Sequence, residues 1–373
     1  MPGPLDGLLV LDFSTLLPGP MATLMLAEAG AEVLKIERPG MGDEMRTYHP
    51  RWGADSVNFA LLNRGKKSIA LDLKDASERA RLAPLVAKAD IIVEQFRPGV
   101  MDRLGLGYDT VSAVNPGIIY CSITGYGQTG PKRDAAGHDV NYMGDAGLLA
   151  LSLGSVEQPV LPPALIADIA GGTYPAMLNI LLALRERDRT GKGARLDIAM
   201  AEGVLPFTYW ALGEGERTGE WPGNATGLVT GGSPRYQLYA CADGRFVAAG
   251  PIEQKFWLAF TAAIGLDPAL VDDGKDPGAT KAGCAAIICA RPSDHWRPIL
   301  AAADCCCTIV ATLQEALADP HFKARGQFDA RVANAEGATQ TAVPMPIARQ
   351  FRPTADTAVA APLLGEHNDR LAT

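Results

Sequence analysis

The sequence predicts an α/β fold: a doubly wound parallel sheet with a smaller α+β domain added to it. Over roughly the first 200 residues, short apolar runs without polar alternation are separated by helical stretches, as in a parallel sheet covered on both faces. Further along, two β-rich runs flank a tight-turn sequence, which indicates antiparallel pairing. The chain has 373 residues, more than one ordinary core holds, so two domains are expected.

The elements of the first half follow from this pattern. Residues 8–13 form an apolar run that predicts a buried strand. A helix is predicted from Met21 to Glu28, after Pro18-Gly19-Pro20, with Gly30 as its C-cap signal. The same alternation predicts strands at residues 31–36, 91–93 and 118–123, and a helix over residues 76–87. These strands would lie in one sheet.

The second half has a different texture. Residues 213–232 are rich in Gly, Thr and Pro and predict a linker or crossover. Residues 236–241 and 245–249 flank Ala242-Asp243-Gly244, which is a hairpin signal. We therefore expect a large domain whose first part is 1–219, a smaller α+β domain at 220–328, and a C-terminal return to the large domain over 329–373.

Composition narrows the class of function. Hydrophobic residues make up 47% of the chain and the net charge is −8, which argues against a nucleic-acid or anionic-membrane surface. We expect no signal peptide and no membrane span. The seven cysteines include three in a row, Cys305 to Cys307, which suits reduced cytoplasmic thiols. No cysteine or histidine spacing predicts a metal site.

One glycine motif is typical of dinucleotide-binding proteins, but the residues that follow it do not fit that function. Gly125 to Gly130 matches G-x-G-x-x-G after a predicted strand. Pro131 stands where a helix should open, and no strand with an acidic ribose contact follows. The glycines are better explained by a tight turn beside a ligand, and no dinucleotide cofactor is expected. The motifs of serine hydrolases and P-loop proteins do not occur in the sequence.

Two residues carry acid–base chemistry, and each also has a plain structural explanation. His138 follows the glycine turn; it is either a loop residue bonded to its neighbours or a group that exchanges protons near neutral pH. Asp168 precedes Gly171-Gly172 and an apolar helix. It is either a helix N-cap, or a carboxylate at a helix start where an anion could be held.

Basic residues near the predicted strand ends indicate a phosphorylated ligand. One or two of them would mean only a solvated surface, but several at the carboxyl edge of one sheet mark a ligand site. They are Arg38, Lys66, Lys67, Lys74, Arg97 and Arg103.

Together these motifs give a specific resemblance that runs nearly end to end. They include Pro18-Gly19-Pro20, Lys35-Ile36-Glu37-Arg38-Pro39, Asn63-Arg64-Gly65-Lys66-Lys67-Ser68, Leu71-Asp72-Leu73-Lys74, Arg97-Pro98-Gly99-Val100, Gly125 to Pro131, and Asp319-Pro320-His321-Phe322 with Arg325-Gly326. The chain resembles the class III CoA-transferase superfamily (CaiB/BaiF-like) and, within it, the α-methylacyl-CoA racemases.

The resemblance implies a fold, a partner and a ligand. It implies a Rossmann-like large domain built from both ends of the chain, a smaller inserted domain, and a homodimer whose subunits interlock as rings. It implies no cofactor, since CoA is part of the substrate. The CoA contacts it implies are Arg38, Leu71, Asp72, Leu73, Lys74, Gln95, Phe96, Arg97 and Arg103.

Two activities share this scaffold. In the transferases, the aspartate that matches Asp168 is a nucleophile that forms an acyl anhydride; in the racemases it pairs with a histidine to move a proton. Transferases commonly carry Gly-Tyr-Asp where this chain has Gly137-His138-Asp139, and Glu253 lies in a racemase-like segment. Both features favour the racemase. Residues 45–62 look longer than in typical racemases and could reshape the acyl pocket.

The expected reaction is the interconversion of (R)- and (S)-2-methylacyl-CoA through an enolate. His138 and Asp168 would act on opposite faces of the α-carbon, and Glu253 would orient His138. Backbone N–H groups of Gly137 to Asp139, or of the helix start after Asp168, are candidate donors to the enolate. Val140 is counted among the substrate contacts, and Asn141 and Tyr142 would line the acyl path. The alternatives are a CoA-transferase that uses Asp168 as nucleophile and a CoA-binding protein without catalysis.

Overall fold

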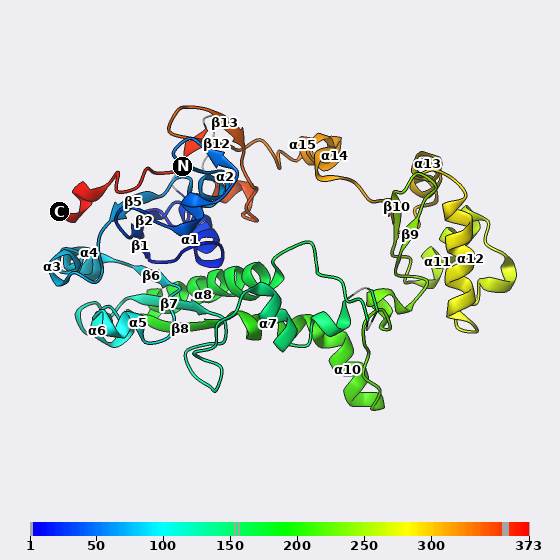
Figure 1. Ribbon diagram of the computed structural model, residues 1–373, viewed down its shortest axis with the longest axis horizontal. Helices are drawn as coiled ribbons and strands as arrows, with labels where there is room; N and C mark the ends of the chain where they lie inside the picture. The colour runs from blue at the N-terminus through cyan, green and yellow to red at the C-terminus, as the bar shows by residue number, and fades with distance from the viewer. Residues whose placement is uncertain (1–2, 153, 156, 353–357, 373) are drawn as a thin grey trace. The chain divides into compact units, whose positions relative to one another are not determined.

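The computed structural model describes residues 3–152, 154–155, 157–352 and 358–372, and a six-stranded sheet organises their first part (Figure 1). All its neighbouring strands pair in parallel, in the order β5-β2-β1-β6-β7-β8. The strands are β1 (Leu9–Asp12), β2 (Glu32–Glu37), β5 (Lys67–Ala70), β6 (Ile91–Glu94), β7 (Ile119–Thr124) and β8 (Ala194–Ala199). The expected α/β class and parallel sheet are confirmed.

The sheet is buried because helices cover both faces. On one face, α4 (Ala83–Lys88), α5 (Val100–Arg103) and α6 (Tyr108–Val114) pack onto the strands. On the other face, α1 (Pro18–Glu28) and α8 (Tyr174–Thr190) contact each other, and α8 lies along β7 and β8. Every residue of β6 and β7 is therefore buried, which explains why these runs show no alternation of apolar and polar residues.

Two predicted helices differ from the observed ones. The helix expected over 76–87 is divided into α3 (Ala76–Ala80) and α4, because Pro84 lacks an N–H and is placed in the first turn of a new helix. The helix expected from Met21 begins three residues earlier, at Pro18. Proline is favoured in a first turn, so Pro18-Gly19-Pro20 opens this helix instead of preceding it.

Residues 44–63 and the C-terminal segment build an annex beside the sheet. The annex contains η1 (Glu44–Thr47), the β3 (Arg51–Trp52) and β4 (Asp55–Ser56) pair, α2 (Val57–Asn63), and the three-stranded sheet of β12 (Arg331–Ala333), β13 (Thr339–Thr341) and β14 (Val359–Ala360). Gly65 N–H donates to Ala360 O at 2.8 Å, and His367 N–H donates to Ser68 O of β5 at 2.9 Å. The end of the chain therefore returns to the large domain.

The chain forms two compact units. The first comprises 1–146, 164–206 and 320–373, and the second 147–163 and 207–319. These bounds differ from the expected ones, 219/220 and 328/329, and residues 147–163 join the second unit. Part of the expected linker at 213–232 is helical. It belongs to α10 (Tyr209–Thr218), which contains two internal glycines and ends at Gly219 in the left-handed conformation.

The second unit contains the predicted hairpin. β9 (Gln237–Ala240) and β10 (Phe246–Ala249) pair antiparallel, and β11 (Cys307–Ile309) joins β10. The helices α11 (Gln254–Ile264), α12 (Pro277–Cys289) and α13 (Ser293–Ala303) bury a separate core on this sheet around Trp257 and Phe260. The α+β character expected here is therefore observed, and all seven cysteines are free thiols.

One helical stretch among the described residues could cross a membrane by length and composition alone. It runs from Ala167 to Thr190, and 44% of its most apolar window is buried. Its α8 part packs on β7 and β8, which is the position of a core helix.

Candidate active site

A cavity of about 440 Å³ opens at the carboxyl edge of the parallel sheet. Its walls come from the chain after β1 (Leu16, Pro18), after β6 (Gln95 to Pro98), around the end of β7 (Ile123 to Tyr126) and after β8 (Met200). The strand order reverses between β1 and β6, since the chain proceeds from β1 to one side of the sheet and from β6 to the other. Such a switch point is the usual ligand site of an open α/β sheet.

His138 reaches this cavity from the loop that joins the glycine turn to α7 (Asp139–Asp145). It is the N-cap residue of α7, and its backbone N–H donates to Asn141 Oδ1 at 3.0 Å. The Tyr142 hydroxyl donates to Gly137 O. A Cβ on Gly137 would lie 2.7 Å from the Tyr142 ring, so glycine is required for this approach. The backbone is therefore fixed on both sides of the imidazole.

Asp168 enters the same cavity from a π-helical turn, η3 (Ala167–Thr173), that leads into α8. The N-cap residue is Ile166, so the helix N-cap interpretation of Asp168 is wrong. Its backbone N–H instead donates to Asp139 Oδ1 at 3.0 Å. A Cβ on Gly171 would lie 2.5 Å from Met200 O, so the glycines let this turn pack closely on α9 (Met200–Gly203). Single π turns of this kind recur at functional sites.

The surroundings of Asp168 favour its protonated form. Burial raises the pKa of this carboxyl to about 6; the buried Asp139 carboxylate contributes to the rise and His138 opposes it. Burial, followed by the charges of Asp168 and Asp139, also raises the pKa of Tyr142 to about 12. An acid with a pKa near 6 can both give and take a proton near neutral pH.

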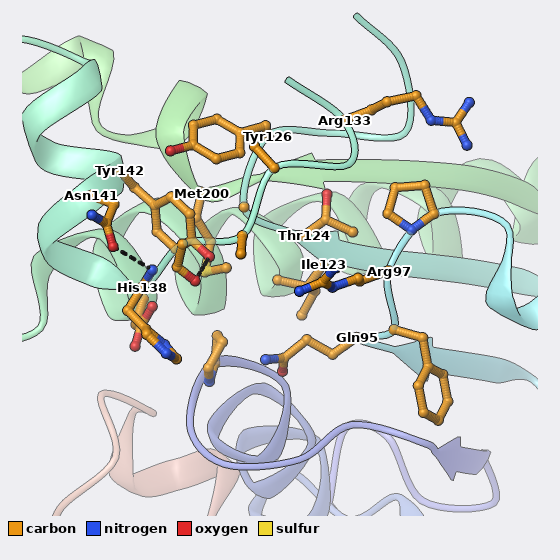
Figure 2. A pocket seen from close by; sticks show the side chains of 18 of the residues that line it. Gln95, Arg97, Ile123, Thr124, Tyr126, Arg133, His138, Asn141, Tyr142 and Met200 are labelled. Carbon is orange, nitrogen blue, oxygen red and sulfur yellow. Dashed lines mark hydrogen bonds between the residues drawn. The ribbon is translucent and has the colours of Figure 1, made fainter. Parts of the chain in front are cut away.

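The opposite side of the cavity carries amide and guanidinium groups. Figure 2 shows Gln95 and Arg97 across the cavity from His138, with Arg133 beyond them. Gln95 Oε1 accepts a hydrogen bond from Gly19 N–H at 3.1 Å. Arg97 and Arg133 are exposed, and among the described residues their guanidinium groups form no ion pair shorter than 3.6 Å. They are available to an anionic ligand.

A second cavity, of about 360 Å³, adjoins the first through a shared wall residue, Phe96. Besides Phe96, its lining includes five more of the residues implied as CoA contacts, namely Arg38, Leu71, Asp72, Leu73 and Lys74. Beneath the shared wall, the buried Glu94 carboxylate accepts a hydrogen bond from Phe96 N–H at 2.9 Å. Burial raises the pKa of Glu94 to about 7.

Three predicted residues of the large unit, Val140, Asp139 and Arg103, line neither cavity. Val140 is 43% exposed on the outer side of α7, and Asp139 is buried behind the site, where it contacts Asp168. Arg103 lies beside the start of α5, where a Cβ added to Gly99 would be 3.3 Å from its Nη1. Glu253 belongs to the second unit, where it is the exposed N-cap residue of α11.

The segment 45–62 supplies no lining residue to the cavity around His138. Met45, Phe59 and Leu62 point instead into a core cluster with Met21, Leu24 and Met345. Several lining residues were missed from the sequence: Leu16, Pro18, Tyr126, Arg133 and Met200. Arg133 carried a signal, since it follows the glycine turn, but its direction depends on the loop conformation. Among the described residues, no group of three or more His, Cys, Asp or Glu side chains could hold a metal ion.

Nearly the whole chain matches a known family. Residues 5–368 fit the model of CoA-transferase family III. The chain belongs to this family. An acetyl-CoA:oxalate CoA-transferase of Acetobacter aceti is 36% identical over 80% of this chain and 78% of its own length. An α-methylacyl-CoA racemase of Mus musculus is 35% identical over 97% of this chain and 91% of its own length.

Solved structures agree with this assignment. A CaiB/BaiF family protein from Brucella suis has a TM-score of 0.79 and 29% identity, and the match covers 100% of this chain and 99% of that one. The resemblance inferred from the sequence motifs is therefore confirmed. The family consists of enzymes, and its racemases and CoA-transferases are similar to this chain at nearly equal identity. A choice between them depends on the site.

Proposed function

We propose that this protein is an isomerase that interconverts (R)- and (S)-2-methylacyl-CoA thioesters. The observation that carries the proposal is that His138 and Asp168 line one cavity, at the switch point of a sheet whose neighbouring cavity suits CoA. Inversion at a carbon requires one group to remove a proton and another to return it on the opposite face. The two side chains come from different elements, α7 and η3, and so can flank a substrate.

In each direction, the proposed reaction removes one proton from the α-carbon and returns one proton to its opposite face. The Asp168 carboxylate takes the α-proton of one enantiomer, the C–H electron pair forms the enolate, and protonated His138 delivers a proton to the other face. For the other enantiomer, neutral His138 takes the proton and the Asp168 carboxylic acid returns one. A pKa of about 6 for Asp168 suits both roles, because either protonation state is accessible near neutral pH.

The two cavities suggest how CoA lies. The thioester would occupy the cavity with His138, and the adenosine end would occupy the cavity lined by Arg38 and Lys74. Phe96 borders both, so one extended ligand can pass over it. Arg97 and Arg133 would pair with phosphate oxygens, which guanidinium groups bind in charge-assisted hydrogen bonds. We expect no cofactor beyond the CoA of the substrate.

The transferase alternative uses the same carboxylate differently. Asp168 Oδ would attack the thioester carbonyl, release the CoA thiolate, and leave a mixed anhydride on the enzyme. The transferase relative at 36% identity favours this reading. Against it, the raised pKa lowers the carboxylate fraction, and a histidine stands beside the aspartate.

A homodimer is part of the proposal. Tyr174, Leu178, Leu181 and Leu182 are large apolar residues exposed on α8, at the spacing of one helical stripe. Exposed apolar patches on a helix indicate a protein interface, and the interlocked dimer implied by the family resemblance would cover one. Light scattering should give twice the monomer mass, and Leu178→Glu with Leu182→Glu should lower it to that of a monomer. We expect a cytoplasmic enzyme.

Deuterium exchange tests the activity. The purified protein is incubated in heavy water with (S)-2-methyldecanoyl-CoA, and NMR follows deuterium at the α-carbon together with loss of chirality. We expect exchange accompanied by racemisation. Absence of exchange, with CoA transfer to a free carboxylic acid and an acyl-enzyme trapped by hydroxylamine, would establish the transferase instead.

A further inference from the structure

We propose that the side-chain amide of Gln95 donates a hydrogen bond to the thioester oxygen and relays the positive N-terminus of α1 to the developing enolate. The inference rests on the proposed function, because it concerns the same cavity. It assigns Gln95 a role at the reacting atoms, beyond contact with CoA.

The orientation of the Gln95 amide follows from its partner. Gly19 N–H lies 3.1 Å from Oε1, and a backbone N–H can only donate. The carbonyl oxygen of the amide must therefore face α1, which leaves Nε2 with two N–H donors. Among the described residues no hydrogen bond from Nε2 is formed, and it is not one of the buried unsatisfied atoms. Figure 2 shows the end of this side chain directed into the cavity, toward the side of His138.

At the start of α1, one backbone N–H, that of Gly19, donates to a side chain outside the helix. Pro18 and Pro20 have no N–H, and Met21 N–H donates to Leu17 O at 2.9 Å. Gly19 therefore provides the one N–H of the first three helical residues, and this N–H is directed at Gln95. The 11-residue helix carries a partial positive charge at this end. A chain of two hydrogen bonds, Gly19 to Gln95 and Gln95 to substrate, polarises cooperatively.

The arrangement is held rigidly, as a site for charge stabilisation requires. A Cβ on Gly19 would lie 2.2 Å from Ser14 Cβ and 2.9 Å from Gln95 Oε1, so the two segments are in close contact. Gln95 stands directly after β6, between buried Glu94 and the wall residue Phe96. It lines the same cavity as His138 and Asp168. Donors fixed before the reaction stabilise an oxyanion without reorganisation.

The first test separates donation from packing. Gln95→Met keeps the size of the side chain but removes the donor, and Gln95→Glu keeps an oxygen for Gly19 N–H while losing the amide donor. Both should slow α-deuterium exchange of 2-methylpropanoyl-CoA by roughly 10²–10³-fold in kcat, the range for loss of one oxyanion donor. The control is Gln314→Met, at an exposed site on α14 (Leu313–Ala318) in the second unit. Exchange by Gln95→Glu at the wild-type rate would overturn the proposal.

The second test needs no turnover, so it remains informative if the isomerase proposal fails. Calorimetry compares 2-methylpropanoyl-CoA with its thioether analogue, in which CH₂ replaces the carbonyl. The wild type should bind the thioester about fivefold more tightly, the value of one neutral hydrogen bond, and Gln95→Met should abolish that preference. An equal preference in wild type and variant would show that Gln95 does not contact this oxygen. Wild-type protein without exchange but with the preference would refute the isomerase alone.

Discussion

Two aspartates of the large unit show how the same side chain serves different ends. Asp12, at the end of β1, is completely buried, with Lys66 Nζ at 3.1 Å. Burial alone would raise its pKa, but Lys66 and Lys35 overcome that effect and lower it to about 2. Asp168 is half-buried and has a pKa of about 6, and no lysine or arginine among the described residues pairs with it.

The comparison shows what distinguishes a structural carboxylate from a reactive one in this fold. Asp12 is held by Lys66 and by the hydroxyls of Ser14 and Thr23, so its ionised form is locked in place. Asp168 faces a second carboxylate, Asp139, and an open cavity. The first arrangement stabilises the fold; the second keeps a proton available. Perturbed carboxylates in clefts are candidates for catalysis for this reason.

The largest expected effect is on activity at Asp168. Asp168→Asn should slow α-proton exchange by on the order of 10³-fold or more, because an amide cannot accept or return the proton. Its folded-state pKa of about 6 lies above the ordinary 3.8, so ionisation costs stability as the pH rises from about 4 through 6. The variant should therefore be at least as stable as the wild type at pH 8. Urea unfolding checks this, and a marked loss of stability would contradict our reading of the site.

The next effect is on stability at Asp12. Asp12→Asn leaves Lys66 without its carboxylate partner in the interior and should lower the free energy of unfolding by about 3–5 kcal/mol. Urea denaturation at pH 7 measures the change. Asp6→Asn, at an exposed position, is the matched control and should stay within about 0.5 kcal/mol. Equal behaviour of the two variants would remove the contrast between Asp12 and Asp168.

A smaller effect, a shift in the pH dependence of proton exchange, is expected when Asp139 is changed. Asp139→Asn keeps an oxygen for the N–H of Asp168 but removes the neighbouring negative charge that helps to raise the pKa of Asp168. The exchange rate that depends on Asp168 as base rises with pH through this pKa, so its midpoint should move to lower pH. Exchange rates between pH 4 and 8 give the midpoint. A shift to higher pH would show that Asp139 acts in some other way.

The smallest effect is expected at Val140. This residue was predicted from the sequence as a substrate contact, yet it is exposed on α7 and lines neither cavity. Val140→Ala should change the exchange rate less than about twofold, in keeping with surface substitutions away from special features. Steady-state kinetics measure it, with Asn141→Ala as the cavity-lining comparison. A KM raised tenfold at Val140 would place the substrate outside the cavity described above.

The sequence predicted the sheet well because fully apolar strands leave a local signal. Residues 8–13 and 91–93 needed no tertiary information to be placed in a covered parallel sheet. The division of the helix predicted over 76–87 also has a local signal, because Pro84 is favoured in the first turn of a new helix. The unit boundary near residue 206 was not readable, because α10 combines internal glycines with helix-forming residues.

The site was only partly predictable. His138 and Asp168 were identified from residue chemistry and family resemblance, and the structure brings them to one cavity. The contact from Asp139 to Asp168 N–H spans 29 residues and arises from the π turn, which no sequence pattern announces. The bond from Gly19 to Gln95 likewise joins residues 76 apart. Such contacts depend on loop conformation, which propensity and periodicity do not encode.

The C-terminal segment has a consequence for how the protein is made. Two of its residues form hydrogen bonds with the backbone of β5, the outermost strand of the parallel sheet. His367 N–H donates to Ser68 O, and Ala70 N–H donates to Asn368 Oδ1. An uncovered edge strand is a template for pairing with other chains. During synthesis Asn368 follows Ala70 of β5 by 298 residues, and the ribosome adds about 5–20 residues per second. The outer edge of the nascent sheet therefore stays uncovered, and open to aggregation, until His367 and Asn368 have been made.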